Sequence, residues 1–148
     1  HTNPLEVIEV RLAVEPVLAR LAALRASRCD IDRLRQLAEE TRTASSADAY
    51  ERVDAAFHRR IAEAVRNALF LALFDTLSAG RRDAGWRRLG ENAHCYKRQS
   101  HYARFHHDIA EAVAARDGER AQALMYEHLS DVQAHIHQHA FPHSAAKA

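Results

Sequence analysis

The segment from residue 53 to residue 65 reads VDAAFHRRIAEAV and indicates which type of fold the chain adopts. Its apolar residues Val53, Phe57, Ile61 and Val65 recur at the spacing of one face of an amphipathic helix. The segment therefore predicts a helix that packs one side against a protein core.

Asp54 and His58 lie at the edge of the same apolar stripe. Side chains at positions i and i+4 of a helix stack one above the other, so this carboxylate and this imidazole are expected to point together into the core. An ionised carboxylate is costly to bury unless something pairs with it. The partner could be a metal ion, an arginine or the neighbouring imidazole, and the helix alone leaves all three open.

The composition favours a single helical domain. A chain of 148 residues is long enough for one core, and its four glycines and three prolines are few for a chain of many turns. With 21 basic and 20 acidic residues, the chain has no basic excess that would bind nucleic acid unaided. No apolar run approaches the roughly 18 residues of a membrane span, so no membrane partner is expected. Cys29 and Cys95 form no CxxC pattern, and we expect a cytoplasmic protein.

Helical periodicity and capping residues predict six helices. Five lie at about residues 4–27, 30–43, 47–65, 96–116 and 119–139, and the fourth in chain order follows a break at Asn67 and ends near Gly80. Asp30 and Ser46 are expected to cap the second and third helices, and Gly118 is available for a left-handed position after the fifth. Pro16 is expected to bend the first helix. The predicted apolar faces include Leu24 of the first helix, and Leu69 and Leu73 of the fourth.

These helices predict an all-α fold, an antiparallel helical bundle of six to seven helices with short connections. Residues 80–95 could be a loop or an extension of the fourth helix. Residues 1–143 are expected to form one ligand-binding domain, and residues 144–148 a disordered tail.

Two further helices offer histidines to the core. His106 precedes the apolar Ile109 by three positions and therefore faces inward, whereas its neighbour His107 should be exposed. His128 lies four positions before Val132 and also faces inward. The core is thus expected to receive imidazoles from three different helices.

Together with the carboxylate, these histidines could form a metal site whose ligands are Asp54, His58, His106 and His128. Three imidazoles and one carboxylate suit a borderline divalent ion such as zinc, nickel, manganese or iron(II). Ligands from facing helices are a known way to build a metal site in a bundle. In the simpler alternative, each inward histidine is a core residue that is hydrogen-bonded to a neighbour.

Five short motifs follow one another along the chain: ExRxxxEP at residues 9–16, DxxFHxxIA at 54–62, NxLF at 67–70, HxxIxxAV at 106–113 and MxxHL at 125–129. In this order they resemble the FCD domain, the FadR-type C-terminal effector domain of GntR-superfamily transcription regulators, over about residues 5–132. In that family an aspartate and three histidines commonly bind a divalent metal. Carried over by position, they are the same four residues that periodicity selects.

The resemblance implies an effector-sensing domain that binds a small organic acid at the metal, with zinc as the first expectation and nickel, manganese or iron as alternatives. Arg11 is the expected second clamp on the carboxylate of the effector, unless it forms a surface salt bridge with Glu15. Asn67 could present its amide to the effector or cap the fourth helix.

Regulators of this family carry a winged helix-turn-helix domain ahead of the effector domain, and nothing in this chain reads as one. DNA binding is therefore expected only through such an upstream domain, and the full-length protein is expected to be a homodimer. No catalytic residues are expected. The alternatives are a metal-dependent hydrolase and a domain whose metal is structural or is itself the signal.

Overall fold

The computed structural model of the chain describes residues 3–80 and 95–140, and all of the secondary structure in these residues is helical. The elements are α1 (Pro4–Arg25), α2 (Arg28–Thr43), α3 (Ala47–Ala64), α4 (Ala68–Gly80), the short 3-10 helix η1 (Cys95–Arg98), α6 (Gln99–Ala114) and α7 (Gly118–Ala140). The prediction of an all-α bundle is confirmed. The predictions for most of residues 80–95 and for the tail at 144–148 fall outside the described residues.

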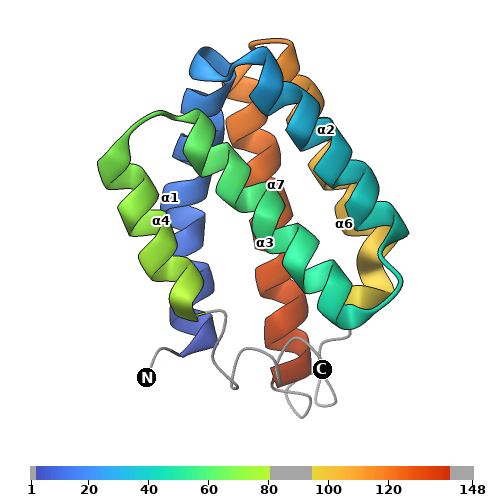
Figure 1. Cartoon of the computed structure of the whole chain (residues 1–148). Coiled ribbons are helices and arrows are strands. Elements are labelled where there is room, and N and C mark those ends of the chain that lie inside the picture. The colour runs from blue at the N-terminus through green and yellow to red at the C-terminus, as the bar shows by residue number, and fades with distance from the viewer. Residues whose placement is uncertain (1–2, 81–94, 141–148) are drawn as a thin grey trace.

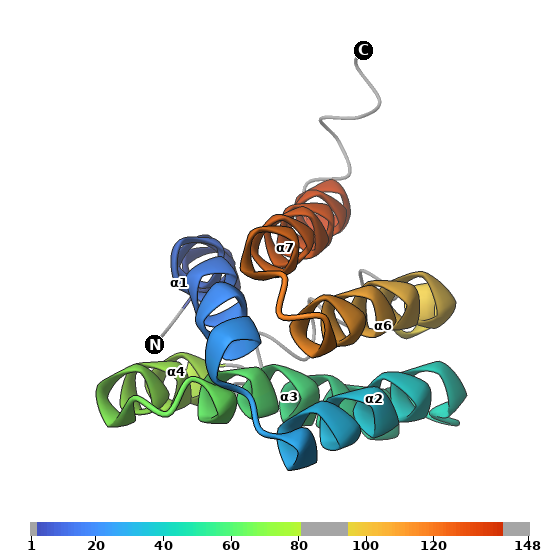
Figure 2. The same ribbon diagram turned by 90° about the horizontal axis from the view of Figure 1, so that it is seen from above.

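The helices form two layers. Figure 2 shows α4, α3 and α2 in one layer and α1, α7 and α6 in the other. In Figure 1, α1 rises from the end of the molecule where both chain termini are marked, and α7 returns toward that end. The helices α1 and α7 therefore run antiparallel, and the two layers enclose the core.

The core contains apolar side chains from all six α-helices of the described residues. Its fully buried members include Ile8, Leu18, Leu34, Phe57, Ile61, Ile109, Met125 and Leu129. The segment at residues 53–65 behaves as expected, because Phe57, Ile61 and Val65 are buried while Val53 is half-buried. The helix α1 continues through Pro16, which is itself buried.

The start of α2 differs from the prediction. Ser27, not Asp30, is the N-cap residue: its side chain accepts a hydrogen bond from the backbone N–H of Asp30 at 3.1 Å. In return, Asp30 Oδ2 accepts one from the N–H of Ser27 at 2.9 Å. Asp30 therefore completes a capping box from inside the first turn of the helix. Ser46 caps α3 as predicted, with its Oγ 3.1 Å from the N–H of Ala49.

The predicted left-handed glycine at position 118 is wrong. Arg116 takes the positive φ of 60° at that corner, and Arg66 takes one of 58° between α3 and α4. Gly118 instead begins α7, where a Cβ atom would lie 3.1 Å from Arg20 Cγ and 3.3 Å from the Arg20 carbonyl oxygen. The glycine therefore allows a close approach between α7 and α1.

The helix that was predicted at 96–116 is divided into η1 and α6, and α6 ends at Ala114.

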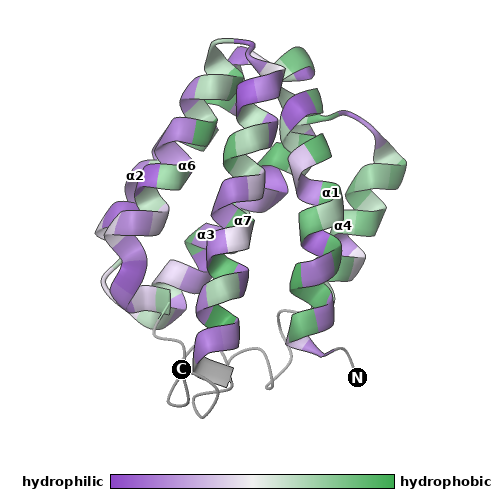
Figure 3. Cartoon of the chain, turned by 180° about the vertical axis from the view of Figure 1, so that it is seen from behind, coloured by the Kyte–Doolittle hydropathy of each residue, from purple (hydrophilic) through white to green (hydrophobic). Residues whose placement is uncertain are grey.

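Three leucines that were expected in the core are exposed. The relative exposures of Leu24, Leu69 and Leu73 are 62%, 83% and 41%. Periodicity placed Leu69 and Leu73 on an apolar face, but α4 lies at the edge of its layer and buries only part of its apolar surface (Figure 3, where most of α4 is green). No helix in the described ranges is both long and apolar enough to cross a lipid bilayer.

Candidate metal centre

The structure brings the four predicted ligand residues together in the middle of the bundle. Asp54 and His58 come from α3, His106 from α6 and His128 from α7, and all four are buried. One potential ligand atom from each residue lies within 4.8 Å of the corresponding atoms of the other three. The inward orientation predicted from periodicity is therefore confirmed for all three histidines.

Asp54 lies beside two of the imidazole rings. Its Oδ1 atom is 3.4 Å from His58 Nε2, one helical turn along α3, and 3.2 Å from His106 Nε2 across the interface with α6. The same edge of each ring thus faces the same carboxylate oxygen. Metal binding by these residues is not tested by the geometry and stays a prediction.

Aromatic packing fixes the orientation of the three rings. Phe57 stacks on His106 with ring centroids 4.1 Å apart and an interplanar angle of 8°. His58 and His128 stack at 5.4 Å, and His106 meets His128 edge-on at 5.1 Å. Rings held in this way keep their nitrogens aimed at one point with little loss of side-chain entropy on binding an ion.

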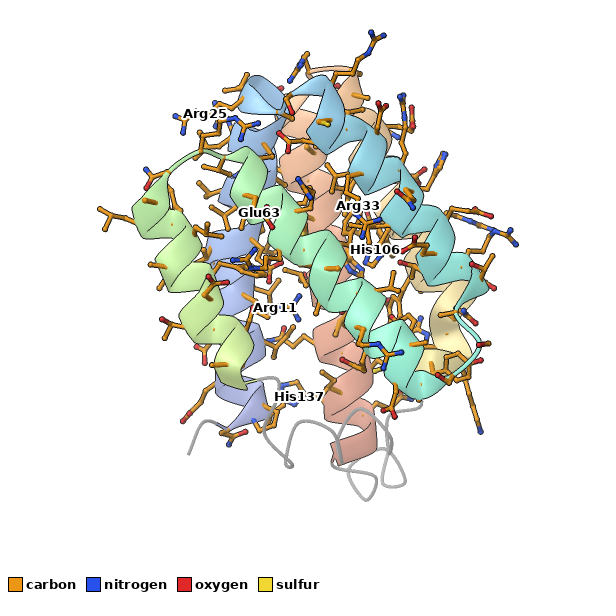
Figure 4. All side chains as sticks on the ribbon, in the orientation of Figure 1. Arg11, Arg25, Arg33, Glu63, His106 and His137 are labelled. Carbon is orange, nitrogen blue, oxygen red and sulfur yellow. The ribbon has the colours of Figure 1, made fainter. Side chains whose placement is uncertain are left out.

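The other nitrogen of His58 is held by α1. His58 Nδ1 lies 2.6 Å from Glu15 Oε1, and the second oxygen of Glu15 accepts a hydrogen bond from Arg11 Nε. Arg11 and Glu15 are 4% and 1% exposed. The ion pair that was considered as an alternative role for Arg11 therefore exists, but it is buried beside the cluster rather than on the surface. Figure 4 shows Arg11 and His106 inside the bundle.

The other nitrogen of His106 is held by α2. Thr41 Oγ1 lies 3.0 Å from His106 Nδ1, and the same hydroxyl donates a hydrogen bond to the carbonyl oxygen of Leu37 at 2.8 Å. Thr41 is fully buried. The sequence pattern carries no signal for Thr41, and none that connects Glu15 with His58.

Charge in this region is balanced by pairing. Burial lowers the pKa of His58, but the carboxylates of Glu15 and Asp54 outweigh burial and raise that pKa above its ordinary value. Burial also raises the pKa of Glu15, whereas Arg11 and His58 together hold it well below its usual range. Glu15 is therefore ionised at neutral pH.

His128 has the opposite tendency. Burial, followed by the nearby His106 and His58, lowers the pKa of His128 well below its ordinary value. The ring is therefore neutral at neutral pH. A neutral imidazole is the form that binds a metal ion.

The donor set fits a divalent metal. His58 Nε2 and His128 Nδ1 are buried and have no hydrogen-bond partner among the residues that the structure describes. A buried polar atom without a partner costs about 1–3 kcal/mol. One cation held by all four residues would satisfy both atoms and neutralise Asp54, and three nitrogens with one oxygen suit zinc and its neighbours in the transition series.

Asn67 lies at the corner between α3 and α4. Its Oδ1 atom accepts hydrogen bonds from the N–H groups of Leu69 at 3.0 Å and Phe70 at 3.2 Å. Asn67 therefore caps α4, which was the other role considered for it. A contact between Asn67 and an effector is untested and stays a prediction.

A separate groove of about 310 Å³ lies at the surface between α2 and α6. Its lining residues are Arg35, Ala38, Glu39, Arg42, Ser100, Ala103, Arg104 and His107. None of them belongs to the buried cluster. The side chain of His107 is 65% exposed, as its position next to His106 predicts.

Comparison with known proteins identifies the fold. The Streptococcus agalactiae GntR structure superposes with a TM-score of 0.71 at 21% identity, covering 87% of this chain and 57% of that one. The E. coli McbR/YncC structure gives a TM-score of 0.73 at 18% identity, covering 90% of this chain and 63% of the other. At these identities the likeness concerns the fold alone.

Two curated relatives have names of transcription regulators. The Uxu operon transcriptional regulator of Escherichia coli (strain K12) is 33% identical over 141 residues, which are 88% of this chain and 52% of that protein. The HTH-type transcriptional regulator LutR of Bacillus subtilis (strain 168) is 28% identical over 132 residues, 86% of this chain and 59% of that protein. The chain thus spans little more than half the length of these relatives.

The sequence profile of the FCD domain matches residues 6–131. This range contains all four residues of the cluster, together with Glu15 and Thr41. This chain belongs to the FCD domain family.

Proposed function

We propose that this chain is the effector-sensing part of a GntR-type transcription regulator, in which a small organic acid binds at a divalent metal. The metal would be held by Asp54, His58, His106 and His128. The observation that carries the proposal is the convergence of these four buried donors within 4.8 Å. The family membership and the names of the curated relatives support the regulatory role.

The ion supplies a positive charge and open coordination positions for an oxygen ligand. Zinc is the first expectation, and nickel, manganese and iron are the alternatives. The chain's own residues hold the ion, exclude water and keep the rings in one orientation. With one carboxylate among the four donors, the centre keeps a net charge near +1 and attracts an anion.

Arg11 is the proposed second contact of the effector. It lies beside the cluster, and among the described residues Glu15 is its only hydrogen-bonding partner, through Nε. The two terminal nitrogens of the guanidinium then remain for the carboxylate of an effector. Asn67 is proposed as a further effector contact through its amide nitrogen, because its Oδ1 atom caps α4.

Effector binding would matter for regulation only if it favours one arrangement of the full-length protein over another. We propose that the second arrangement involves an upstream winged-helix domain, through which the protein binds DNA. A homodimer is also proposed. It is supported by large apolar side chains that remain exposed on α1 and α4, namely Val10, Val17, Leu24, Leu69 and Leu73.

The proposal is tested by thermal unfolding of the zinc-loaded chain with a panel of hydroxy acids, sugar acids and dicarboxylates. At least one acid is expected to raise the unfolding temperature beyond the effect of zinc, and its neutral amide is not. Arg11→Lys should weaken that response, whereas Arg20→Lys, at an exposed position of α1, should not. Stabilisation by zinc with no response to any acid would favour a structural metal or a sensor of the metal itself.

A further inference from the structure

We propose that Glu15 and Thr41 are positioning residues of the metal centre, which decide which ring nitrogen of His58 and His106 faces the ion. Through these two residues, metal binding would also restrain α1 and α2, which supply none of the four predicted ligands. The inference rests on the proposed function, because it concerns the same centre. It assigns roles to two residues outside the ligand set.

Glu15 determines which ring nitrogen of His58 is available to a metal ion. An ionised carboxylate can only accept hydrogen bonds, so the contact of 2.6 Å requires the proton of the ring to be on His58 Nδ1. When His58 binds a metal ion, its lone pair would then be on Nε2, the atom that lies 3.4 Å from Asp54 Oδ1. Arg11 binds the second oxygen of Glu15 and keeps the carboxylate in this position.

Thr41 determines in a different way which ring nitrogen of His106 is available to a metal ion. A hydroxyl has one proton, and Thr41 uses it in the bond to the carbonyl oxygen of Leu37. Thr41 Oγ1 must therefore accept from His106 Nδ1, at 3.0 Å. This places the lone pair of His106 on Nε2, which lies 3.2 Å from Asp54 Oδ1.

These two contacts extend the centre to every α-helix of the described residues except α4. The ligand residues belong to α3, α6 and α7, while the outer partners come from α1 and α2. An ion that fixes His58 and His106 therefore also restrains Glu15 and Thr41. Because Glu15 is charged and Thr41 is neutral, Glu15 should strengthen metal binding by His58 more than Thr41 strengthens metal binding by His106.

The first experiment compares zinc affinities in competition with a chromophoric chelator. Thr41→Val removes the hydroxyl at nearly constant shape and should weaken zinc binding about ten- to a hundredfold, whereas Thr41→Ser keeps the hydroxyl and should bind like the wild type. Thr43→Val is the matched control, because Thr43 is exposed on the same helix. Unfolding of each zinc-free variant reports its fold independently.

The second experiment uses Glu15→Gln, with Glu9→Gln as the exposed control on α1. Zinc affinity should fall at least as much as in Thr41→Val. Since Glu15→Gln leaves Arg11 without its carboxylate, the double variant of Arg11→Gln with Glu15→Gln removes both charges and keeps the test available if the single variant does not fold. Nitrogen NMR of the zinc-loaded wild type should show His58 and His106 bound through Nε2 and protonated at Nδ1.

The outcomes separate this inference from the proposed function. A wild type that binds zinc while Thr41→Val and the Glu15 variants stay within about threefold of its affinity would overturn the inference and leave the metal site standing. Binding of zinc through Nδ1 of either ring would overturn it as well. A wild type that binds no divalent metal would refute the proposed function, and the inference would fail with it.

Discussion

Asp54 at the centre of the bundle and Asp30 at one end of it are both buried, at 7% and 3% exposure, but their surroundings differ. Asp30 is surrounded by donors: the N–H of Ser27 at 2.9 Å, Arg66 Nη2 at 2.7 Å and Arg60 Nη1 at 3.4 Å. Asp54 is flanked by imidazole nitrogens, and the other nitrogens of those rings contact Thr41 Oγ1 and Glu15 Oε1.

The difference is the one expected between a structural carboxylate and a metal ligand. At Asp30 the protein supplies the positive charge and the hydrogens, so the group is complete as folded. At Asp54 the neighbours are imidazole rings from two helices, which are common metal ligands. A divalent cation is therefore expected at Asp54 and not at Asp30.

The largest expected effect concerns two adjacent histidines. His106→Ala should lose most of the bound metal, because it removes one of four donors from the centre. His107→Ala should keep the metal, since that side chain lies in the surface groove. Metal content of both purified variants, measured by elemental analysis, checks this. Equal loss in both would mean that the helical facing argument does not locate the site.

The next effect is stabilisation by the metal. Zinc should raise the free energy of unfolding by about 2.7 kcal/mol when free zinc is about 100 times its Kd. The same gain is expected in Asp30→Asn, because Asp30 is not among the four predicted metal ligands. It should be absent in His106→Ala. Urea unfolding of each protein, with zinc and with a chelator, measures the gain; a loss of it in Asp30→Asn would remove the contrast between the two carboxylates.

The smallest expected effect is the pH dependence of the stability that Asp30 contributes. Burial raises the pKa of Asp30, but the hydrogen bonds with Ser27, the charge of Arg66 and the hydrogen bond from Arg60 together outweigh burial and lower that pKa below its ordinary value of 3.8. A lowered pKa in the folded state adds stability that is present above pH 3.8 and is lost as pH falls through the folded value.

Asp30→Asn should therefore destabilise the metal-free chain by about 1 kcal/mol at neutral pH. The difference from the wild type should narrow as pH falls below 3.8. Urea unfolding across this pH range tests it, with Asp32→Asn as the control because Asp32 is exposed on the same helix. A difference that stays constant with pH would show that the charge of Asp30 contributes nothing.

Helical periodicity predicts the facing of residues within one helix, and this part of the site could be read from the sequence. It separates His106 from His107 and places Asp54 with His58, because successive residues of a helix point about 100° apart. It also predicts the all-α fold, since long apolar stripes are separated by short capping segments.

Contacts between helices could not be predicted in the same way. Glu15 meets His58 across 43 positions of the sequence, and Thr41 meets His106 across 65. These pairs depend on how two helices cross, which the periodicity of either helix does not contain. The same limit explains the exposed Leu69 and Leu73, because an apolar face is buried only where another helix covers it.

The most direct test of the central claim is the metal content of the purified wild type beside Asp54→Ala and Asp30→Asn. We expect about one divalent ion per chain in the wild type and in Asp30→Asn, and almost none in Asp54→Ala. No metal in the wild type, even after incubation with zinc or nickel, would contradict the account. Asp54 would then be a structural carboxylate, as Asp30 is.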